Sequence, residues 1–392
     1  MRPLITGAHA GGILRGMETM WAIRKLRAEP GLVLDEVAVP APADDEVLVR
    51  VEAASVCGTD LHIFRWDDWS QHRIRPPLTL GHEFAGTVVE IGRNVRYAQP
   101  GDYVSAESHV TCGHCFNCRT GRAHMCEQTR ILGVDRDGAF AEFVAVPESV
   151  LWHNDRAKLP PEIATLQEPF GNAVFATSHI DLAGKSVAVL GCGPIGLFSI
   201  GIVRASGAGR VLASDAHSFR LDLARQMGAD TIDVRETFDV GHRFVEHNEG
   251  EHLDVVFEMS GAPDAIEMAF RIARNGGHVV LFGIPARPVT VDIAETLIFK
   301  NLTVAAISGR EIFATWYKTR WLLEHGVVDL GPLITDRLPM SQFAQAFALL
   351  ESGEACKLVL HPDSVGTGEL VATPDEAADS DLVLPLARWS HR

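Results

Sequence analysis

Basic residues are few in this sequence, and it contains no long apolar run. Its 35 lysine and arginine residues stand against 51 aspartate and glutamate residues, so the formal charge is -16 at pH 7. Such a charge repels phosphate backbones and anionic membrane surfaces, and we therefore expect no nucleic-acid partner. The first 20 residues hold no apolar stretch of signal-peptide length, and no later stretch approaches a membrane span. We expect a cytoplasmic protein without a membrane partner.

Cysteine is also scarce, with seven residues among 392, yet four of the seven fall within 15 residues. They follow the pattern C-x2-C-x2-C-x7-C. Disulfides are rare in the cytoplasm, so this spacing favours metal binding over disulfides or free surface thiols. Four thiolates surround one tetrahedral zinc and leave no position open for a substrate, which predicts a structural zinc site. Its ligands are Cys112, Cys115, Cys118 and Cys126.

Two patterns of apolar residues divide the chain, in which 46% of the residues are hydrophobic. From Trp21 to about Ala145, alternating segments such as VLVRVEAASV, FAGTVVEIG and AEFVAVP are broken by glycines, which predicts a mainly β domain. From about Gly184, strand-like segments such as SVAVL, RVLAS and DVVFEMS alternate with helix-like segments such as IGLFSIGIVRA and DAIEMAFRIAR. This alternation predicts a parallel, doubly wound sheet, so the fold class is α/β.

A glycine loop follows the first strand of the second pattern. In SVAVLGCGPIG, Gly191, Gly193 and Gly196 form G-x-G-x-x-G between a predicted strand and a predicted helix, a context that favours dinucleotide binding. These glycines permit a tight turn, approach of the backbone to the pyrophosphate, and close packing of helix on strand. Asp215 ends the next predicted strand. A carboxylate at this position accepts hydrogen bonds from the hydroxyl groups of the adenosine ribose and repels a 2′-phosphate, so Asp215 predicts NAD rather than NADP as the cofactor. Arg220 is a further ribose contact or an ordinary solvated helix charge.

A second group of potential metal ligands precedes the cysteine cluster. Cys57 lies in VCGTDLH, and His82 and Glu83 lie in GHEFAGTVVEIG; these are ligand types of catalytic zinc. Taken singly, such a cysteine is more often a buried core residue, and such a histidine a structural one. Thr59 and His62 lie two and five residues beyond Cys57, where a hydroxyl and an imidazole can release a proton to water. Because zinc activates an alcohol oxygen as a Lewis acid, the group predicts alcohol oxidation.

Glu168, in QEPFGNAV, lies at the junction of the two predicted domains. Two interpretations of this residue are about equally favoured. In the first, it is a further ligand of the catalytic zinc that exchanges with water. In the second, it is a carboxylate that forms an ion pair at the domain junction.

Together, VCGTDLH, GHEFAGTVVEIG, the four-cysteine segment and LGCGPIG resemble the zinc-containing medium-chain alcohol dehydrogenases. The resemblance spans about residues 20–361 and implies a GroES-like catalytic domain with a Rossmann domain. Within that family, HIFRWDDWSQ, HVTCGHCFNCRTGRAHMC, EPFGNAV, EMSGAP and GREIFATWYK resemble the L-threonine 3-dehydrogenases. The implied parts are an N-terminal extension at 1–19, a GroES-like domain at 20–172 that 315–361 complete, a Rossmann domain at 173–314 and an acidic, disordered tail at 362–392.

The resemblance also implies ligands and a reaction. Cys57, His82 and Glu83 would hold catalytic zinc, Thr59 and His62 would relay the proton, and the cysteine cluster would hold a second zinc. The cofactor NAD would contact the glycine loop, Asp215, and Ile195, Arg220, Phe282, Gly283, Ile284, Ile307 and Ser308. The implied protein is a homotetramer that oxidises a small-molecule alcohol, L-threonine, to 2-amino-3-oxobutanoate.

The sequence departs from the family pattern at three places, and two alternative functions remain open. Ser308 stands where these enzymes commonly carry tyrosine, Glu168 stands where aspartate is common, and the acidic tail is extra. A polyol, a vicinal diol or an aminocyclitol is an alternative substrate, because the zinc and relay residues would be the same. A catalytically silent NAD-binding protein is the alternative from another class. The intact ligand and relay set argues against it.

Overall fold

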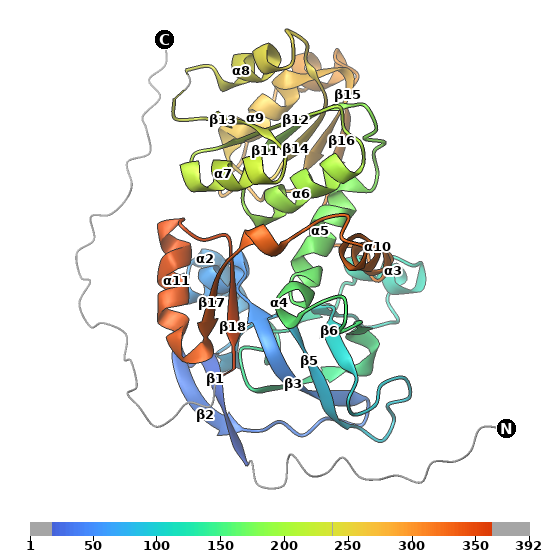
Figure 1. Ribbon diagram of the computed structural model, residues 1–392, viewed down its shortest axis with the longest axis vertical. Helices are drawn as coiled ribbons and strands as arrows, with labels where there is room; N and C mark the ends of the chain where they lie inside the picture. The colour runs from blue at the N-terminus through green and yellow to red at the C-terminus, as the bar shows by residue number, and fades with distance from the viewer. Residues whose placement is uncertain (1–17, 237, 363–392) are drawn as a thin grey trace, which may run out of the picture.

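The computed structural model describes residues 18–236 and 238–362, which form two lobes (Figure 1). The predicted N-terminal extension and acidic tail lie almost wholly outside the described residues. The lower lobe in Figure 1 is rich in β-strands, and the upper lobe is a parallel sheet flanked by helices. No helix in the described part of the chain is long and apolar enough to cross a membrane. The predicted α/β class is confirmed.

The lower lobe is built on one mixed sheet, with a small antiparallel sheet beside it. Its strands are β1 Thr19–Lys25, β2 Val33–Ala38, β3 Glu46–Ser55, β4 Leu78–Thr79, β5 Glu83–Ile91, β6 Tyr103–Ala106, β7 His109–Val110, β8 Arg130–Ile131, β9 Phe143–Pro147, β10 Leu151–His153, β17 Ile334–Pro339 and β18 Lys357–His361. The larger sheet has the order β10-β6-β5-β3-β18-β17, and β9 also pairs with β3. The smaller sheet has the order β2-β1-β4, and β7 pairs with β8.

Helices of this half pack around the sheets and connect it to the upper lobe. They are α1 Gly58–Arg65, α2 Asp68–Arg73, α3 Phe116–Arg119, α4 Pro161–Ala164, α5 Gln167–Thr177, α10 Ala314–Glu324 and α11 Phe343–Ser352. In Figure 1, α5 runs between the two lobes. Nearly all of its residues are buried, which is why its sequence lacks the polar face of a surface helix.

Strand β3 is the centre of the lower lobe, because it is buried on both faces. Val47, Val49 and Val51 pack into one hydrophobic cluster, and Leu48 packs into another with Met20. Burial of each such side chain contributes about 1.5–3 kcal/mol. The strand ends at residue 55, two residues before the first predicted zinc ligand, and this packing therefore holds that ligand at a fixed place.

The upper lobe is a six-stranded parallel sheet. Its strands are β11 Ser186–Leu190, β12 Arg210–Asp215, β13 Asp230–Asp233, β14 Leu253–Glu258, β15 Ala273–Leu281 and β16 Thr303–Ala306, and its helices are α6 Pro194–Ala205, α7 Ser218–Gln226, α8 Val240–His247 and α9 Pro263–Ile272. The strand order is β13-β12-β11-β14-β15-β16. In this doubly wound order the direction of winding reverses between β11 and β14. In doubly wound folds, dinucleotides bind at the carboxyl ends of the strands where this reversal occurs.

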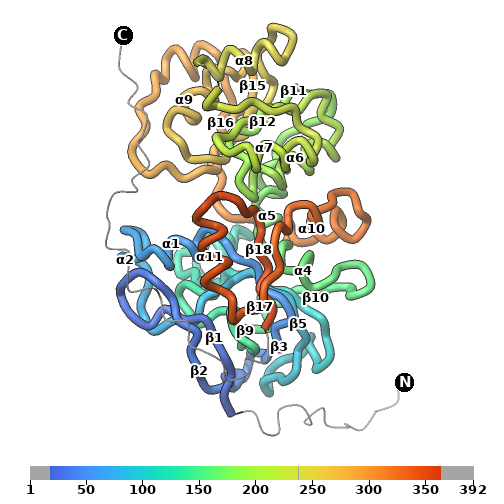
Figure 2. The backbone as a smooth tube through the Cα atoms, turned by 60° about the vertical axis from the view of Figure 1, so that its left-hand side comes forward, coloured from blue at the N-terminus to red at the C-terminus, as the bar shows by residue number. Residues whose placement is uncertain are grey.

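The last described strands return to the lower lobe. Strand β18 runs antiparallel to β3, with Val359 opposite Ser55 and Leu360 opposite Ala54. Figure 2 shows this red end of the described chain beside the strands from its beginning. On α11, Phe347 is fully buried and lies 5.0 Å from the ring of Phe64 on α1. Residues from the end of the described chain, on β18 and α11, thus pack against residues from near its beginning, on β3 and α1.

Candidate active site

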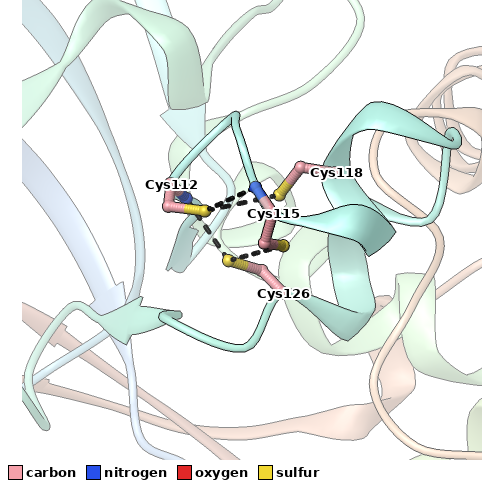
Figure 3. A group of neighbouring side chains, drawn as sticks. All are labelled: Cys112, Cys115, Cys118 and Cys126. Atoms are coloured by element: carbon pink, nitrogen blue, oxygen red, sulfur yellow. Dashed lines mark hydrogen bonds between the residues drawn. The ribbon is translucent and has the colours of Figure 1, made fainter.

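The four clustered cysteines converge in one segment of the lower lobe (Figure 3). The Sγ atoms of Cys112 and Cys118 lie 4.0 Å apart, and those of Cys115 and Cys126 are also 4.0 Å apart. A zinc ion with Zn–S bonds of about 2.3 Å separates its sulfurs by about 3.8 Å, so these four are placed for a tetrahedral ion. The structure describes all seven cysteines, and all are free thiols.

Backbone N–H groups point at these sulfurs and favour their ionised forms. The N–H groups of Cys112 and Gln128 each lie 3.3 Å from Sγ of Cys126. Burial opposes ionisation, but these donors lower the pKa of Cys126 to about 6. Burial and the neighbouring thiols raise the pKa of Cys118 to about 12, because adjacent thiolates repel one another. A bound divalent cation removes that repulsion, so the set fits a closed zinc site.

Cys57, His82 and Glu83 form a second group, whose ligand atoms all lie within 4.8 Å of one another. Cys57 immediately precedes α1, and the other two lie at the start of β5. Two buried polar atoms here, Nδ1 of His82 and Oε1 of Glu83, have no hydrogen-bond partner among the described residues. Leaving a buried carboxylate oxygen unpaired is costly. A thiol, an imidazole and such an oxygen fit an open zinc site.

Two further charged residues lie behind these ligands. The Nζ atom of Lys357 donates to Oε2 of Glu83 at 2.5 Å. Burial disfavours the ammonium, but the charges of Glu83 and Cys57 outweigh burial and raise the pKa of Lys357. Asp60 is fully buried; its Oδ2 accepts the N–H of Cys57 at 2.9 Å, and its Oδ1 lies 3.8 Å from Nδ1 of His82. Neither of these two atoms has a hydrogen-bond partner among the described residues, so the carboxylate acts on the ring through its charge.

Thr59 and His62 lie three residues apart on α1, so their side chains are neighbours on one face of the helix. The Oγ1 atom of Thr59 lies 3.8 Å from Sγ of Cys57. His62 is 57% exposed, and its Nδ1 lies 2.5 Å from Oδ2 of Asp67. One residue of the predicted relay therefore touches a predicted ligand, and the other meets solvent. The relay itself stays a prediction.

A buried ion-pair cluster joins the segment after β16 to the lower lobe. Arg310 is 2% exposed; its Nε donates to Oε2 of Glu107 at 2.8 Å, and its Nη2 donates to Oε1 of Glu168 at 2.6 Å. Burial alone would raise the pKa of Glu107, but the guanidinium outweighs it and lowers the pKa to about 2. Glu168 thus forms an ion pair, in a group with Glu107 and His109 rather than with Cys57. Its role as an exchanged ligand stays a prediction.

The glycine loop connects β11 to α6 where the strand order reverses. Gly191 has φ +96°, a conformation that side chains rarely adopt. A Cβ at Gly196 would lie 2.0 Å from the carbonyl oxygen of Gly191, so the helix packs this closely only because that atom is missing. A Cβ at Gly193 would meet no heavy atom within 4 Å, which leaves open space at its backbone. This geometry fits a pyrophosphate at the N-terminus of α6.

The other predicted cofactor residues lie near the carboxyl ends of the same strands. Asp215 is the last residue of β12, and its carboxylate accepts the N–H groups of Cys192 at 2.8 Å and His217 at 2.9 Å. Ile284 is 90% exposed. The remaining positions follow β15 or β16, or lie on α6 or α7: Phe282, Gly283, Ile307, Ser308, Ile195 and Arg220. Their contacts with a cofactor stay predictions.

Sequence reasoning missed several charged residues around these sites: Asp60, Asp67, Glu107, Arg310 and Lys357. Two of them carry a local signal. Lys357 begins the otherwise apolar strand KLVLH, and Asp67 follows His62 by five residues. Glu107 and Arg310 are separated by 203 residues, and no local pattern pairs them.

Comparisons with known proteins cover both lobes. The family described as Alcohol dehydrogenase GroES-like domain matches residues 43–156, and the family described as Zinc-binding dehydrogenase matches residues 194–324. An L-threonine 3-dehydrogenase from Symbiobacterium thermophilum is 47% identical over 347 residues, which cover 88% of this chain and 99% of the relative.

Solved structures share the same arrangement. A protein described as a zinc-binding dehydrogenase, from Sinorhizobium meliloti and bound to NADP, matches with TM-score 0.81 and 29% identity, over 88% of this chain and 99% of that one. A 2R,3R-butanediol dehydrogenase from Bacillus subtilis matches with TM-score 0.79 and 28% identity, over 88% and 100%. The matches therefore extend over the strand-rich lobe and the parallel sheet alike.

Proposed function

Because this chain belongs to the zinc-binding dehydrogenases with an alcohol dehydrogenase GroES-like domain, we propose that it oxidises L-threonine to 2-amino-3-oxobutanoate with NAD. Membership of the family makes it an oxidoreductase that acts on an alcohol. The choice of substrate is supported by curated relatives at 43–47% identity, which are L-threonine 3-dehydrogenases. The structural observation that carries the proposal is the group of Cys57, His82 and Glu83 with Thr59 in contact.

In this proposal Cys57, His82 and Glu83 hold the catalytic zinc, which when bound acts as a Lewis acid on the substrate hydroxyl. Asp60 places a buried negative charge behind the ring of His82. Lys357 occupies Oε2 of Glu83 and leaves Oε1 free to face the ion. The four clustered cysteines hold a second, structural zinc, so that metal analysis should find two zinc ions per chain.

The proton of the substrate hydroxyl leaves through two side chains of α1. Oγ1 of Thr59 accepts this proton while it passes its own proton to the ring of His62. The half-exposed imidazolium then releases the proton to water. The nicotinamide, when bound, supplies the acceptor for the hydride.

Asp215 supports NAD rather than NADP as the cofactor. Its carboxylate lies at the end of β12, where the adenosine ribose sits in doubly wound folds, and its charge repels a 2′-phosphate. Arg220 on the following helix is a further ribose contact in the proposal. The glycine loop holds the pyrophosphate, and the residues after β15 and β16 lie where the nicotinamide end would be.

The test is formation of the reduced nicotinamide cofactor with L-threonine, sorbitol, 2,3-butanediol and an aminocyclitol, each with NAD and with NADP. Preferred turnover of L-threonine with NAD supports the proposal. Turnover of another alcohol alone overturns the substrate and keeps the family. The butanediol dehydrogenase among the structural matches makes a vicinal diol the second candidate. One inert zinc ion per chain and no turnover would favour the silent NAD-binding alternative.

A homotetramer in the cytoplasm completes the proposal. Self-association is supported by apolar side chains on and before edge strand β16: Ile293, Ile298, Phe299 and Val304 are 59%, 66%, 71% and 39% exposed. A strand at the edge of a sheet, with exposed apolar side chains on it and before it, is a suitable surface for a second copy. Light scattering coupled to size exclusion tests the mass, and cell fractionation tests the location.

A further inference from the structure

His62 is held by a residue from the next helix. Its Nδ1 lies 2.5 Å from Oδ2 of Asp67, and its ring makes a T-shaped contact with Trp69 at a centroid separation of 6.2 Å. The neighbouring cation on α1, Arg65, is directed elsewhere, since its Nε lies 2.9 Å from Glu351 on α11. Asp67 is therefore the charged group that contacts the relay imidazole.

Asp67 is itself fixed in place. It is the N-cap residue of α2, where its Oδ1 accepts the N–H of Ser70 at 3.0 Å and the hydroxyl of Ser70 at 3.0 Å. Although burial raises the pKa of Asp67, these bonds and the bond from His62 outweigh it and lower the pKa. An ionised carboxylate can only accept hydrogen bonds. The hydrogen between Asp67 and His62 must therefore sit on Nδ1 of the imidazole.

We propose that Asp67 is a positioning residue that keeps His62 in the Nδ1–H tautomer, so that Nε2 carries the lone pair that receives the proton from Thr59. The inference rests on the proposed function, because it assigns a partner to the relay. The proton bonds to Nε2 as the O–H bond of Thr59 breaks, and the imidazolium afterwards loses the same proton to water. Without the carboxylate, the two tautomers of a half-exposed imidazole lose this bias.

The substitution Asp67→Asn should change the tautomer of His62 without disturbing the fold. Asparagine is as good an N-cap as aspartate, so its Oδ1 keeps the bonds to Ser70. Its amide NH2 then faces Nδ1 of His62 as a donor, which requires a lone pair on Nδ1 and moves the hydrogen to Nε2. That ring can no longer accept a proton at Nε2. The matched control is Asp68→Asn, which removes the same charge one residue further along α2.

Two measurements are made on each variant. Nitrogen-15 NMR of histidine-labelled protein without substrate, with His62→Gln to assign the signal, should show the Nδ1–H tautomer in the unsubstituted chain and the Nε2–H tautomer in Asp67→Asn. Steady-state kinetics should show kcat reduced about 10- to 100-fold in Asp67→Asn with KM little changed, the size usual for loss of a carboxylate that orients a functional histidine. Asp68→Asn should match the unsubstituted chain in both measurements.

The outcomes separate this inference from the proposed function. An Nε2–H tautomer in the unsubstituted chain overturns the inference, whether or not any variant folds. Unchanged kcat in Asp67→Asn also overturns it. If L-threonine is not a substrate, the proposed function fails, while the NMR result still decides the contact and the kinetics are repeated with the alcohol that is oxidised.

Discussion

Two glycines of the cofactor loop should respond in opposite ways to the same added methyl group. Gly193→Ala places its Cβ in open space, since no heavy atom lies within 4 Å of that position. Gly196→Ala places its Cβ 2.0 Å from the carbonyl oxygen of Gly191. The first change should therefore impair cofactor binding and spare the fold. The second should destabilise the fold.

The magnitudes follow from these distances. Real Cβ atoms essentially never approach closer than 3.0 Å, so α6 and the loop must separate by about 1 Å in Gly196→Ala. Overpacking of this kind costs about 1–3 kcal/mol, and alanine in a helix returns somewhat less than about 1 kcal/mol. A net loss of about 1 kcal/mol lowers Tm by about 2–4 °C. Gly193 has φ -66° and ψ 176°, which alanine adopts freely. The Tm of the Gly193→Ala variant should therefore stay level or rise slightly.

Calorimetric unfolding and isothermal titration with NAD measure both effects. We expect Gly193→Ala to raise the Kd for NAD about ten- to a hundredfold, because the methyl group occupies the space where the backbone approaches the pyrophosphate. Addition of NAD should stabilise the unsubstituted chain more than this variant. Unchanged NAD affinity in Gly193→Ala would contradict the proposal that the pyrophosphate binds at this loop. An unchanged Tm in Gly196→Ala would refute the argument from the packing of α6 on the loop.

Three further predictions concern the metal sites and the buried charges. Cys112→Ser should lower the zinc content, measured by atomic emission, from two ions per chain to one and should reduce Tm, whereas retention of both ions would contradict the assignment. In protein depleted of the proposed catalytic zinc, Lys357→Met leaves Glu83 as an uncompensated buried charge and should cost about 3–5 kcal/mol in urea unfolding, with Lys357→Arg less affected. The pKa of Glu107 is lowered from 4.5 to about 2, so its ionisation stabilises the fold above pH 4.5. That contribution of about 3 kcal/mol is lost as the pH falls towards 2, and Glu107→Gln should flatten this part of the stability profile.

Features that depend on nearby residues could be predicted from the sequence. The four cysteines lie within 15 residues of one another, and the glycine loop lies between a strand and a helix that its own neighbours define. The alternating segments became strands β3, β5, β6 and β9, because alternation is the signature of a pleated surface. The cysteine segment has the composition of a loop, yet it contains the short helix α3, whose four residues are too few for a periodic signal.

Partners from distant parts of the chain could not be predicted. Lys357 meets Glu83 across 274 residues, and Arg310 meets Glu107 across 203. Such pairs depend on strand order, here on β18 joining β3, and a single sequence does not encode that order in any local pattern. The two interpretations of Glu168 stayed open for the same reason, since its ion-pair partner lies 142 residues away.

The return of β18 to β3 also sets the order in which the nascent chain can fold. The parallel sheet is contiguous, from residue 186 to residue 306, so it can form while synthesis continues. The mixed sheet cannot close until His361 has left the ribosome, because β17 and β18 are among its strands. Until then Glu83 lacks the ammonium of Lys357. The proposed catalytic metal site is therefore one of the last parts of the described chain to be completed. A ribosome-stalled chain that ends before β18 should carry a folded parallel sheet and an incomplete set of the groups around Glu83.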